Sequence, residues 1–121
     1  MRINICKLPN PADCKHKTYM NEKILCSAIW FNNDEPYVHQ PKNIKTGLVI
    51  CGLRHCNCYQ TIYILSNNES KYKLQFKKIT EGFLTNLNRF VDREEAYIIA
   101  LNAKQIDLRI NGSALYSEDL Y

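Results

Sequence analysis

An arginine and a histidine stand side by side in CGLRHCNC, residues 51–58. Gly52 permits a sharp bend, after which Arg54 offers a planar fork of N–H donors that suits a phosphate group. The imidazole of His55 can donate to or accept from the same ligand, and Asn57 can hydrogen-bond a base edge or a ribose hydroxyl. These residue types predict a site for a phosphorylated ligand. The structural alternative is a turn whose polar side chains face water.

The same stretch also holds zinc-type ligands, namely Cys51, His55, Cys56 and Cys58. They are bunched together and lack the paired Cys-x-x-Cys spacing of structural zinc sites. We therefore predict neither a metal site nor a cofactor, although a metal or redox role for the cysteines stays open. Cys26 and Cys51 lie in apolar runs and are expected to be reduced, buried thiols.

A second candidate site is the polar loop between Phe83 and Phe90, which holds Asn88 and Arg89. Aromatic rings at its edges could stack a base, and its amide and guanidinium groups could bind sugar or phosphate. The loop leads into a helix N-terminus that would favour an anion, but Asp92 and acidic neighbours already occupy that end. The alternative is a loop pinned by asparagine side chains, with both phenylalanines in the core.

No pattern of catalytic residues stands out. REEA, residues 93–96, superficially resembles the helix of the Nudix hydrolases, but YIIALNA follows where further metal-binding carboxylates should be. His55 has no carboxylate partner close in sequence. We predict that the protein is not an enzyme.

The elements that must position these residues are mainly strands. Alternating or apolar runs predict strands over 22–31, 45–51, 58–65 and 71–79, a short one at 82–85 and another near 108–110. A helix is expected over about 93–104, with Asp92 as N-cap and a buried stripe of Ala96, Ile99, Ala100 and Ala103. The sequence predicts an α+β, mainly β single domain over 1–121, an antiparallel β-sandwich-like core with one clear helix and a second short helix.

Bulk properties narrow the class of protein. The chain has 121 residues with 45% apolar content, and no apolar run approaches the length of a membrane span. The net charge is +4, and residues 1–60 carry eight Lys/Arg against four Asp/Glu. This excess leans toward anionic partners without the dense basic runs of a nucleic-acid binder. The first residues lack the apolar region of a signal peptide, so we expect a cytoplasmic protein without a membrane partner.

Three blocks in the same order, HQPKNIKTGLVICGLRHCNC, GFLTNLNRFVDREEAYIIA and LYSEDLY, resemble the phage-encoded Thoeris anti-defence protein 1 family. The resemblance implies a small β-rich fold that assembles as homodimers or larger homo-oligomers. It also implies a molecular sponge, which binds cyclic ADP-ribose isomers made by bacterial TIR-domain sensors and holds them intact in the host cytoplasm. Carried onto this chain, the ligand-binding positions are Arg54, His55, Phe83, Asn88, Arg89, Phe90 and Arg109.

Two other classes of function are kept as alternatives. One is a small nucleotide hydrolase or cyclic-nucleotide phosphodiesterase, which would release a cleaved product. The other is a nucleic-acid-binding regulator, suggested by the basic first half and by tyrosine-rich segments. On charge distribution alone nucleic acid is the less favoured partner, and we expect a small cyclic nucleotide.

Overall fold

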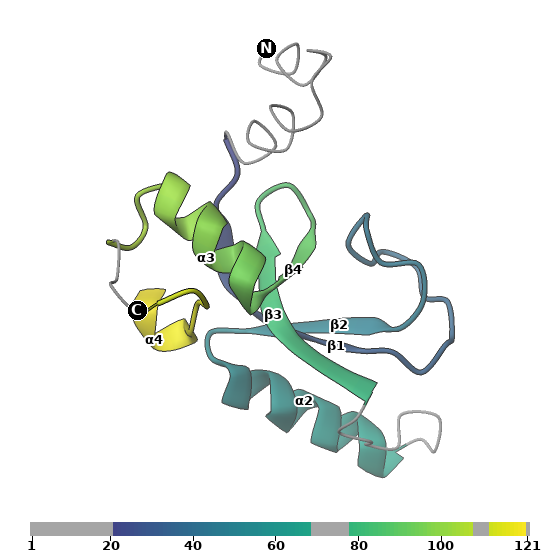
Figure 1. The fold of residues 1–121 in the computed structure, drawn as a ribbon. Coiled ribbons are helices and arrows are strands. Elements are labelled where there is room, and N and C mark those ends of the chain that lie inside the picture. The colour runs from purple at the N-terminus through teal and green to yellow at the C-terminus, as the bar shows by residue number, and fades with distance from the viewer. Residues whose placement is uncertain (1–20, 69–77, 108–111, 121) are drawn as a thin grey trace, which may run out of the picture.

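The computed structural model describes residues 21–68, 78–107 and 112–120 (Figure 1). Within them four strands form one antiparallel sheet in the order β2-β1-β3-β4. The strands are β1 (Ile24–Phe31), β2 (Leu48–Gly52), β3 (Ile79–Thr85) and β4 (Phe90–Asp92). The helices are α2 (His55–Asn68), α3 (Arg93–Asn102) and the short α4 (Ser117–Leu120). The predicted α+β class with an antiparallel sheet is confirmed, and in this part of the chain helices supply the layer that packs on the sheet.

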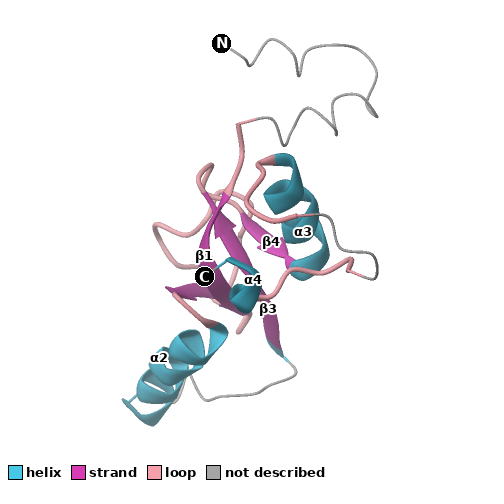
Figure 2. Ribbon diagram, turned by 90° about the vertical axis from the view of Figure 1, so that its left-hand side faces the viewer, coloured by secondary structure: helices cyan, strands magenta, loops and turns pink. Residues whose placement is uncertain are grey.

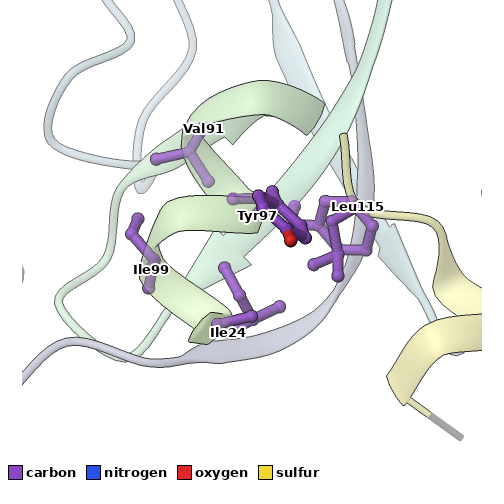
Figure 3. Packing of buried hydrophobic residues seen from close by; sticks show 8 residues of the cluster. Ile24, Val91, Tyr97, Ile99 and Leu115 are labelled. Atoms are coloured by element: carbon purple, nitrogen blue, oxygen red, sulfur yellow. The ribbon is translucent and has the colours of Figure 1, made fainter. Parts of the chain in front are cut away.

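One face of the sheet carries both clusters of buried apolar side chains. Phe83 lies opposite Ser27, and Ile29 follows Ser27 by two residues, so all three share a face. Ile29 belongs to the cluster under α2, and Phe83 belongs to the cluster under α3. In Figures 1 and 2, α3 lies above and α2 below, as separate helices. The α3 cluster (Figure 3) comprises Ile24, Phe83, Val91, Ala96, Tyr97, Ile99, Ala100 and Leu115.

Helix α3 begins as predicted. Asp92 is the N-cap, and its Oδ1 accepts a hydrogen bond from the backbone N–H of Glu95 at 2.8 Å. The predicted stripe is buried at Ala96, Ile99 and Ala100, whereas Ala103 is the C-cap. The helix therefore ends two residues before the predicted boundary.

The strand predicted over 58–65 is wrong, because these residues form part of the helix α2. Isoleucine, threonine and tyrosine favour strands, and they led to that interpretation. Cys58 and Ile62 are nevertheless buried one helical turn apart, with Tyr59 and Leu65 packed beside them. This spacing of one, four and seven residues is the helical period, and burial against Ile29 and Ile50 outweighs the local preference.

The other predicted strands have mixed outcomes. Those over 22–31 and 45–51 correspond to β1 and β2, and the short one at 82–85 is the end of β3. The strand β4, which completes the sheet, was not predicted. Residues 71–77 and 108–111 lie outside the described residues, and so do Arg109 and most of the strand predicted over 71–79. No helix in the described ranges is long and apolar enough to cross a membrane.

The second face of the sheet meets the connection of residues 32–47. Trp30 lies on this face, donates from Nε1 to the carbonyl of Thr46 at 2.9 Å, and packs at 6.1 Å from the ring of Phe90. Gly47 has φ of 90°, and a Cβ there would come within 2.5 Å of Trp30 Nε1. Glycine is thus required for the connection to close over Trp30.

Candidate anion site at the start of helix α2

The turn between β2 and α2 is held in place from both sides. Ser27 Oγ donates to the carbonyl of Leu53 at 3.1 Å, and the thiol of Cys58 donates to the carbonyl of Arg54 at 3.6 Å. A Cβ at Gly52 would lie 2.9 Å from Cβ of Asn57, so a glycine lets the first turn of the helix fold back onto the end of the strand. The result is a tight strand–turn–helix unit.

Arg54 occupies the N-cap position of α2. Its carbonyl accepts from the backbone N–H of Asn57 at 3.0 Å, and its own N–H donates to Asn57 Oδ1 at 2.9 Å. The first N–H groups of an α-helix have no intrahelical partner, and a guanidinium carries no acceptor that could cap them. The carbonyl of Arg54 also accepts from the N–H of Cys58 at 3.4 Å, so the N–H groups that a ligand at this helix end could meet are those of His55 and Cys56.

The charge at this helix end differs from that at α3. The first turn of α2 holds no acidic residue, whereas Glu94 and Glu95 follow the Asp92 cap of α3. The partial positive charge at the N-terminus of α3 is offset by these acidic side chains. At the N-terminus of α2 no acidic side chain in the first turn offsets it, and Arg54 adds a further positive charge. Cys56 and Asn57 are exposed, whereas Arg54 is half-buried and its Nη1 is buried. This arrangement can hold a phosphate or another anion.

The imidazole of His55 points away from solvent into the fold. Nε2 lies 2.8 Å from the carbonyl of Gly82, and Nδ1 lies 3.4 Å from Nη2 of Arg93. A carbonyl only accepts and a guanidinium only donates, so Nε2 carries the proton and Nδ1 accepts. Burial is the main cause that lowers the pKa of His55, and the charge of Arg93 acts in the same direction. The lowered pKa favours the neutral form of the ring, which packs edge-on against Phe83 at 5.1 Å.

Arg93 is the residue at this location that sequence reasoning missed. It donates to Glu81 and, at 2.8 Å, to the carbonyl of Leu115, and its guanidinium lies 4.7 Å from the ring of Tyr116. Glu81 also accepts from the hydroxyl of Tyr59 at 2.7 Å. Burial raises the pKa of Glu81, but the hydrogen bonds from Arg93 and Tyr59 outweigh it and hold the pKa below its usual value. This network joins α2, β3, α3 and the C-terminal segment.

Arg89 lies in an internal ion-pair network. Its Nε and Nη2 donate to the two oxygens of Glu22 at 2.9 and 3.1 Å, and Nη2 also donates to Glu95 at 2.9 Å. The side chain of Glu22 is fully buried and also accepts from Thr85 Oγ1 at 2.6 Å. These bonds raise the pKa of Arg89 above its usual range, the pair with Glu22 contributing most. The contacts explain why an arginine stands here without invoking a ligand.

The two phenylalanines of the predicted site lie on opposite faces of the sheet. Phe83 is fully buried beneath α3, whereas Phe90 pairs with the next residue, Leu84, and packs against Trp30. Successive residues of a strand face opposite sides, so the two rings cannot enclose one base within a single chain. Asn88 is exposed in the β3–β4 turn with φ of 60°, and its carbonyl accepts from the N–H of Lys42 at 2.9 Å.

The structure therefore divides the predicted site residues. Arg54 and His55 adjoin each other and Phe83 lies behind His55, while Asn88, Arg89 and Phe90 belong to the β3–β4 end of the sheet. The guanidinium of Arg89 is held by Glu22 and Glu95 and not by a group near Arg54. Contact of a ligand with any of these residues stays a prediction.

The cysteines do not lie as predicted. Cys51 is exposed and Cys26 is half-buried, so the expectation that both are buried thiols is wrong. The reason is that both lie on the face of the sheet that α2 and α3 leave uncovered. In the described ranges of the chain, no three His, Cys, Asp or Glu side chains come close enough together to hold a metal ion.

A family model described as Phage T4 y16D protein matches residues 23–121. The match begins just after Glu22 and includes every described strand and helix. No curated protein and no solved structure matches the chain.

Proposed function

The chain belongs to the Phage T4 y16D protein family, and on this premise we propose that it binds a small phosphate-bearing nucleotide and holds it unaltered. The ligand class that we propose is the cyclic ADP-ribose isomers made by bacterial TIR-domain sensors. Sequestering this signal in the cytoplasm of the infected bacterium would block Thoeris defence. A phage origin of the family fits this role, and so does the resemblance of the three sequence blocks to Thoeris anti-defence protein 1.

The observation that carries the proposal is the start of α2. Arg54 lies at the N-cap, no acidic residue stands in the first turn, and the exposed Cys56 brings its backbone N–H to this helix end. A pyrophosphate carries two negative charges, and charge-assisted hydrogen bonds from a guanidinium and a helix N-terminus are the strong interactions that it can make here.

The burial and hydrogen bonds of His55 favour binding of an intact nucleotide over its hydrolysis. Its ring is buried, and both nitrogens are engaged, by Gly82 and by Arg93. The side chain nearest to the start of α2 that could act as a base therefore has no free nitrogen for proton transfer. His55 contributes to the proposed site through its backbone N–H and through its fixed position.

Silencing a signal present at about micromolar concentration demands nanomolar affinity, about −12 kcal/mol. For a ligand of roughly 35 heavy atoms this is near the limit of about 0.3 kcal/mol per atom, which calls for an enclosed site. Cys56 and Asn57 at the start of α2 are exposed on the single chain. We propose that a second copy of the chain covers the ligand, as expected of a homodimer or larger assembly.

The first test separates ligand binding from folding. Arg54→Ala should weaken binding of a 1″-linked cyclic ADP-ribose by about 1.5–3 kcal/mol, measured by calorimetry. Cys56→Asp should abolish binding, because it places a carboxylate among the donors. The same substitution should stabilise the free protein by about 0.3–1 kcal/mol through the helix dipole. Cys56→Ser and Lys45→Ala are controls and should bind normally. Unchanged binding by Cys56→Asp would contradict the proposal.

The second test concerns the fate of the ligand. Protein loaded with the nucleotide, washed and then heated should release it intact, as measured by mass spectrometry. A cleaved product would instead identify a hydrolase. Retention of nucleic acid, with an affinity that falls steeply with salt concentration, would identify the nucleic-acid-binding alternative.

A further inference from the structure

Two cysteines lie next to each other on the second face of the sheet, opposite α2 and α3. Cys51 of β2 pairs with Ala28 of β1, and Cys26 precedes Ala28 by two residues on the same face. Cys26 and Cys51 are therefore diagonal neighbours on adjacent strands. The two thiols are close enough that each shifts the pKa of the other. The pair lies outside the start of α2, and the proposed function makes no use of it.

The two sulfur atoms differ in chemical character. A hydrogen bond from Cys51 is the main cause that lowers the pKa of Cys26 to about 7, and the backbone N–H of Gly52 adds to it against the effect of burial. The pKa of Cys51 is raised above its usual value, mainly because its thiol is the donor to Cys26. Cys26 is therefore the sulfur that becomes a thiolate near neutral pH, and Cys51 is the exposed thiol beside it.

We propose that Cys26 and Cys51 form a redox-active thiol pair that is oxidised by low-molecular-weight disulfides such as glutathione disulfide. The Cys26 thiolate attacks one sulfur of that disulfide, which forms a Cys26–glutathione mixed disulfide and releases one glutathione thiolate. Cys51 then loses its proton to solvent and attacks Sγ of Cys26, so that a Cys26–Cys51 bond forms and the second glutathione leaves. The protein loses two electrons and two protons, and one glutathione disulfide becomes two glutathione molecules.

The backbone geometry favours a reversible bond. Diagonal neighbours in an antiparallel pair lie about 7–8 Å apart at Cα, above the usual range of about 4.4–6.8 Å for a disulfide, so β1 and β2 must draw together for the bond to form. The β1–β3 register shifts between Ile24 and Cys26, so the regular pairing of β1 with β3 is interrupted next to Cys26. A bond formed under such strain is more easily reduced than a structural disulfide, as expected of a switch that equilibrates with glutathione.

Tryptic peptides allow a direct test, because Cys26 and Cys51 fall in different peptides, residues 24–42 and 46–54, while Cys56 and Cys58 share a third, residues 55–71. The full-length protein would be incubated with mixtures of reduced and oxidised glutathione, quenched by alkylation and digested without reduction. We expect a cross-linked 24–42/46–54 species, lighter by two hydrogen atoms than the two peptides together. It should appear before glutathione is found on Cys56, and excess reduced glutathione should remove it.

Variants assign the roles of the two sulfurs. Cys51→Ser should leave glutathione trapped on Cys26, whereas Cys26→Ser should slow oxidation of Cys51 to the rate of Cys56. Cys58→Ala is the matched control, because Cys58 is fully buried with its pKa raised by burial to about 11, and it should leave the cross-link unchanged. The proposal would be overturned by alkylation of Cys26 at pH 7 no faster than Cys56, or by glutathione on Cys26 of the wild type with no cross-link.

Discussion

Three arginines of this chain have different partners, and those partners decide what each can do for a ligand. Arg89 holds the buried Glu22, and Arg93 holds Glu81 and the carbonyl of Leu115. Arg54 instead heads a helix whose first turn contains no acid. A guanidinium already bound to buried carboxylates is a structural element, whereas one at a helix N-terminus adds to a surface that favours anions.

The contacts of Arg89 predict a large loss of stability on its removal. Arg89→Ala leaves the carboxylate of Glu22 buried without its bidentate partner, which should cost about 3–5 kcal/mol of the free energy of unfolding. Urea denaturation followed by circular dichroism measures this. Arg54→Ala is the control and should lie within about 0.5 kcal/mol of the wild type. Equal stability of the two variants would mean that Glu22 does not depend on Arg89.

Because the pKa of His55 is lowered in the folded protein, we expect the protein to lose stability in mild acid. The pKa of this ring is lowered in the folded state by burial, while in the unfolded chain it returns to its usual value of 6.5. As pH falls below 6.5 the unfolded chain takes up a proton that the folded chain does not. Folding therefore weakens by at most about 1.4 kcal/mol per pH unit until the folded pKa is reached.

The measurement is the free energy of unfolding between pH 7.5 and 5, in the wild type and in His55→Gln. The ring of His55 faces Arg93, Glu81, Glu118 and the carbonyl of Gly82, and the pKa of Glu81 lies lower than this window. Cys26, whose pKa is lowered to about 7, contributes only to the upper part of this window, so we expect the slope below pH 6.5 to disappear in His55→Gln. An equal slope in both proteins would assign it to other groups.

At the scale of elements, the N-cap of α3 makes a contribution to the free energy of unfolding that can be measured by itself. Asp92→Ala removes the acceptor of the Glu95 N–H and should destabilise the protein by about 1 kcal/mol, while Asp92→Ser should recover most of that loss. Thermal unfolding of the two variants measures the difference. Asp107→Ala, an exposed site after the helix, removes the same charge and should have no effect. Identical unfolding of Asp92→Ala and Asp92→Ser would contradict the capping role.

The sequence allowed α3 to be predicted almost to its ends, because local signals decide it. Asp92 caps it, and Ala96, Ile99 and Ala100 give a clear helical stripe. Helix α2 was mistaken for a strand because its tyrosines, isoleucines and threonine favour extended chain. Cys58 and Ile62 pack on Ile29, about thirty residues earlier in the chain, and this burial overrides the local preference. A contact between residues so far apart cannot be predicted from local sequence.

In the candidate site, too, features set by neighbouring residues could be predicted, whereas contacts between distant residues could not. The position of Arg54 after a strand and Gly52 could be predicted, since it depends on neighbours in the chain. The partners of Arg89 and His55 could not, because Glu22 and Arg93 lie 67 and 38 residues away along the chain. Phe83 and Phe90 flank one loop in the sequence, yet β4 forms its own pairing and turns the two rings to opposite faces.

For the whole molecule, a side-chain amide of the 32–47 connection bonds the backbone of one residue on each edge strand of the described sheet. Gln40 Oε1 accepts from the N–H of Val49 in β2 at 2.8 Å. Asn43 exchanges two hydrogen bonds with the backbone of Phe90 in β4, at 2.7 and 2.9 Å. A second copy that extended the sheet would have to displace these amides. The assembly we propose is therefore one in which side-chain surfaces meet and enclose the ligand.

Leu53 provides the test of that assembly, because it directly precedes Arg54 and is 56% exposed. If a second copy covers the start of α2, Leu53→Gln should remove apolar contact between the copies and weaken both association and nucleotide binding, without adding a charge that would repel phosphate. Val38→Gln, at the still more exposed Val38 of the 32–47 connection, should change neither. Sedimentation velocity gives the mass, and calorimetry on the same samples gives affinity and stoichiometry.

A Leu53→Gln monomer that binds the nucleotide at wild-type affinity would show that one chain encloses the ligand alone. Joint loss of the dimer and of binding would instead place the phosphate between two α2 helices.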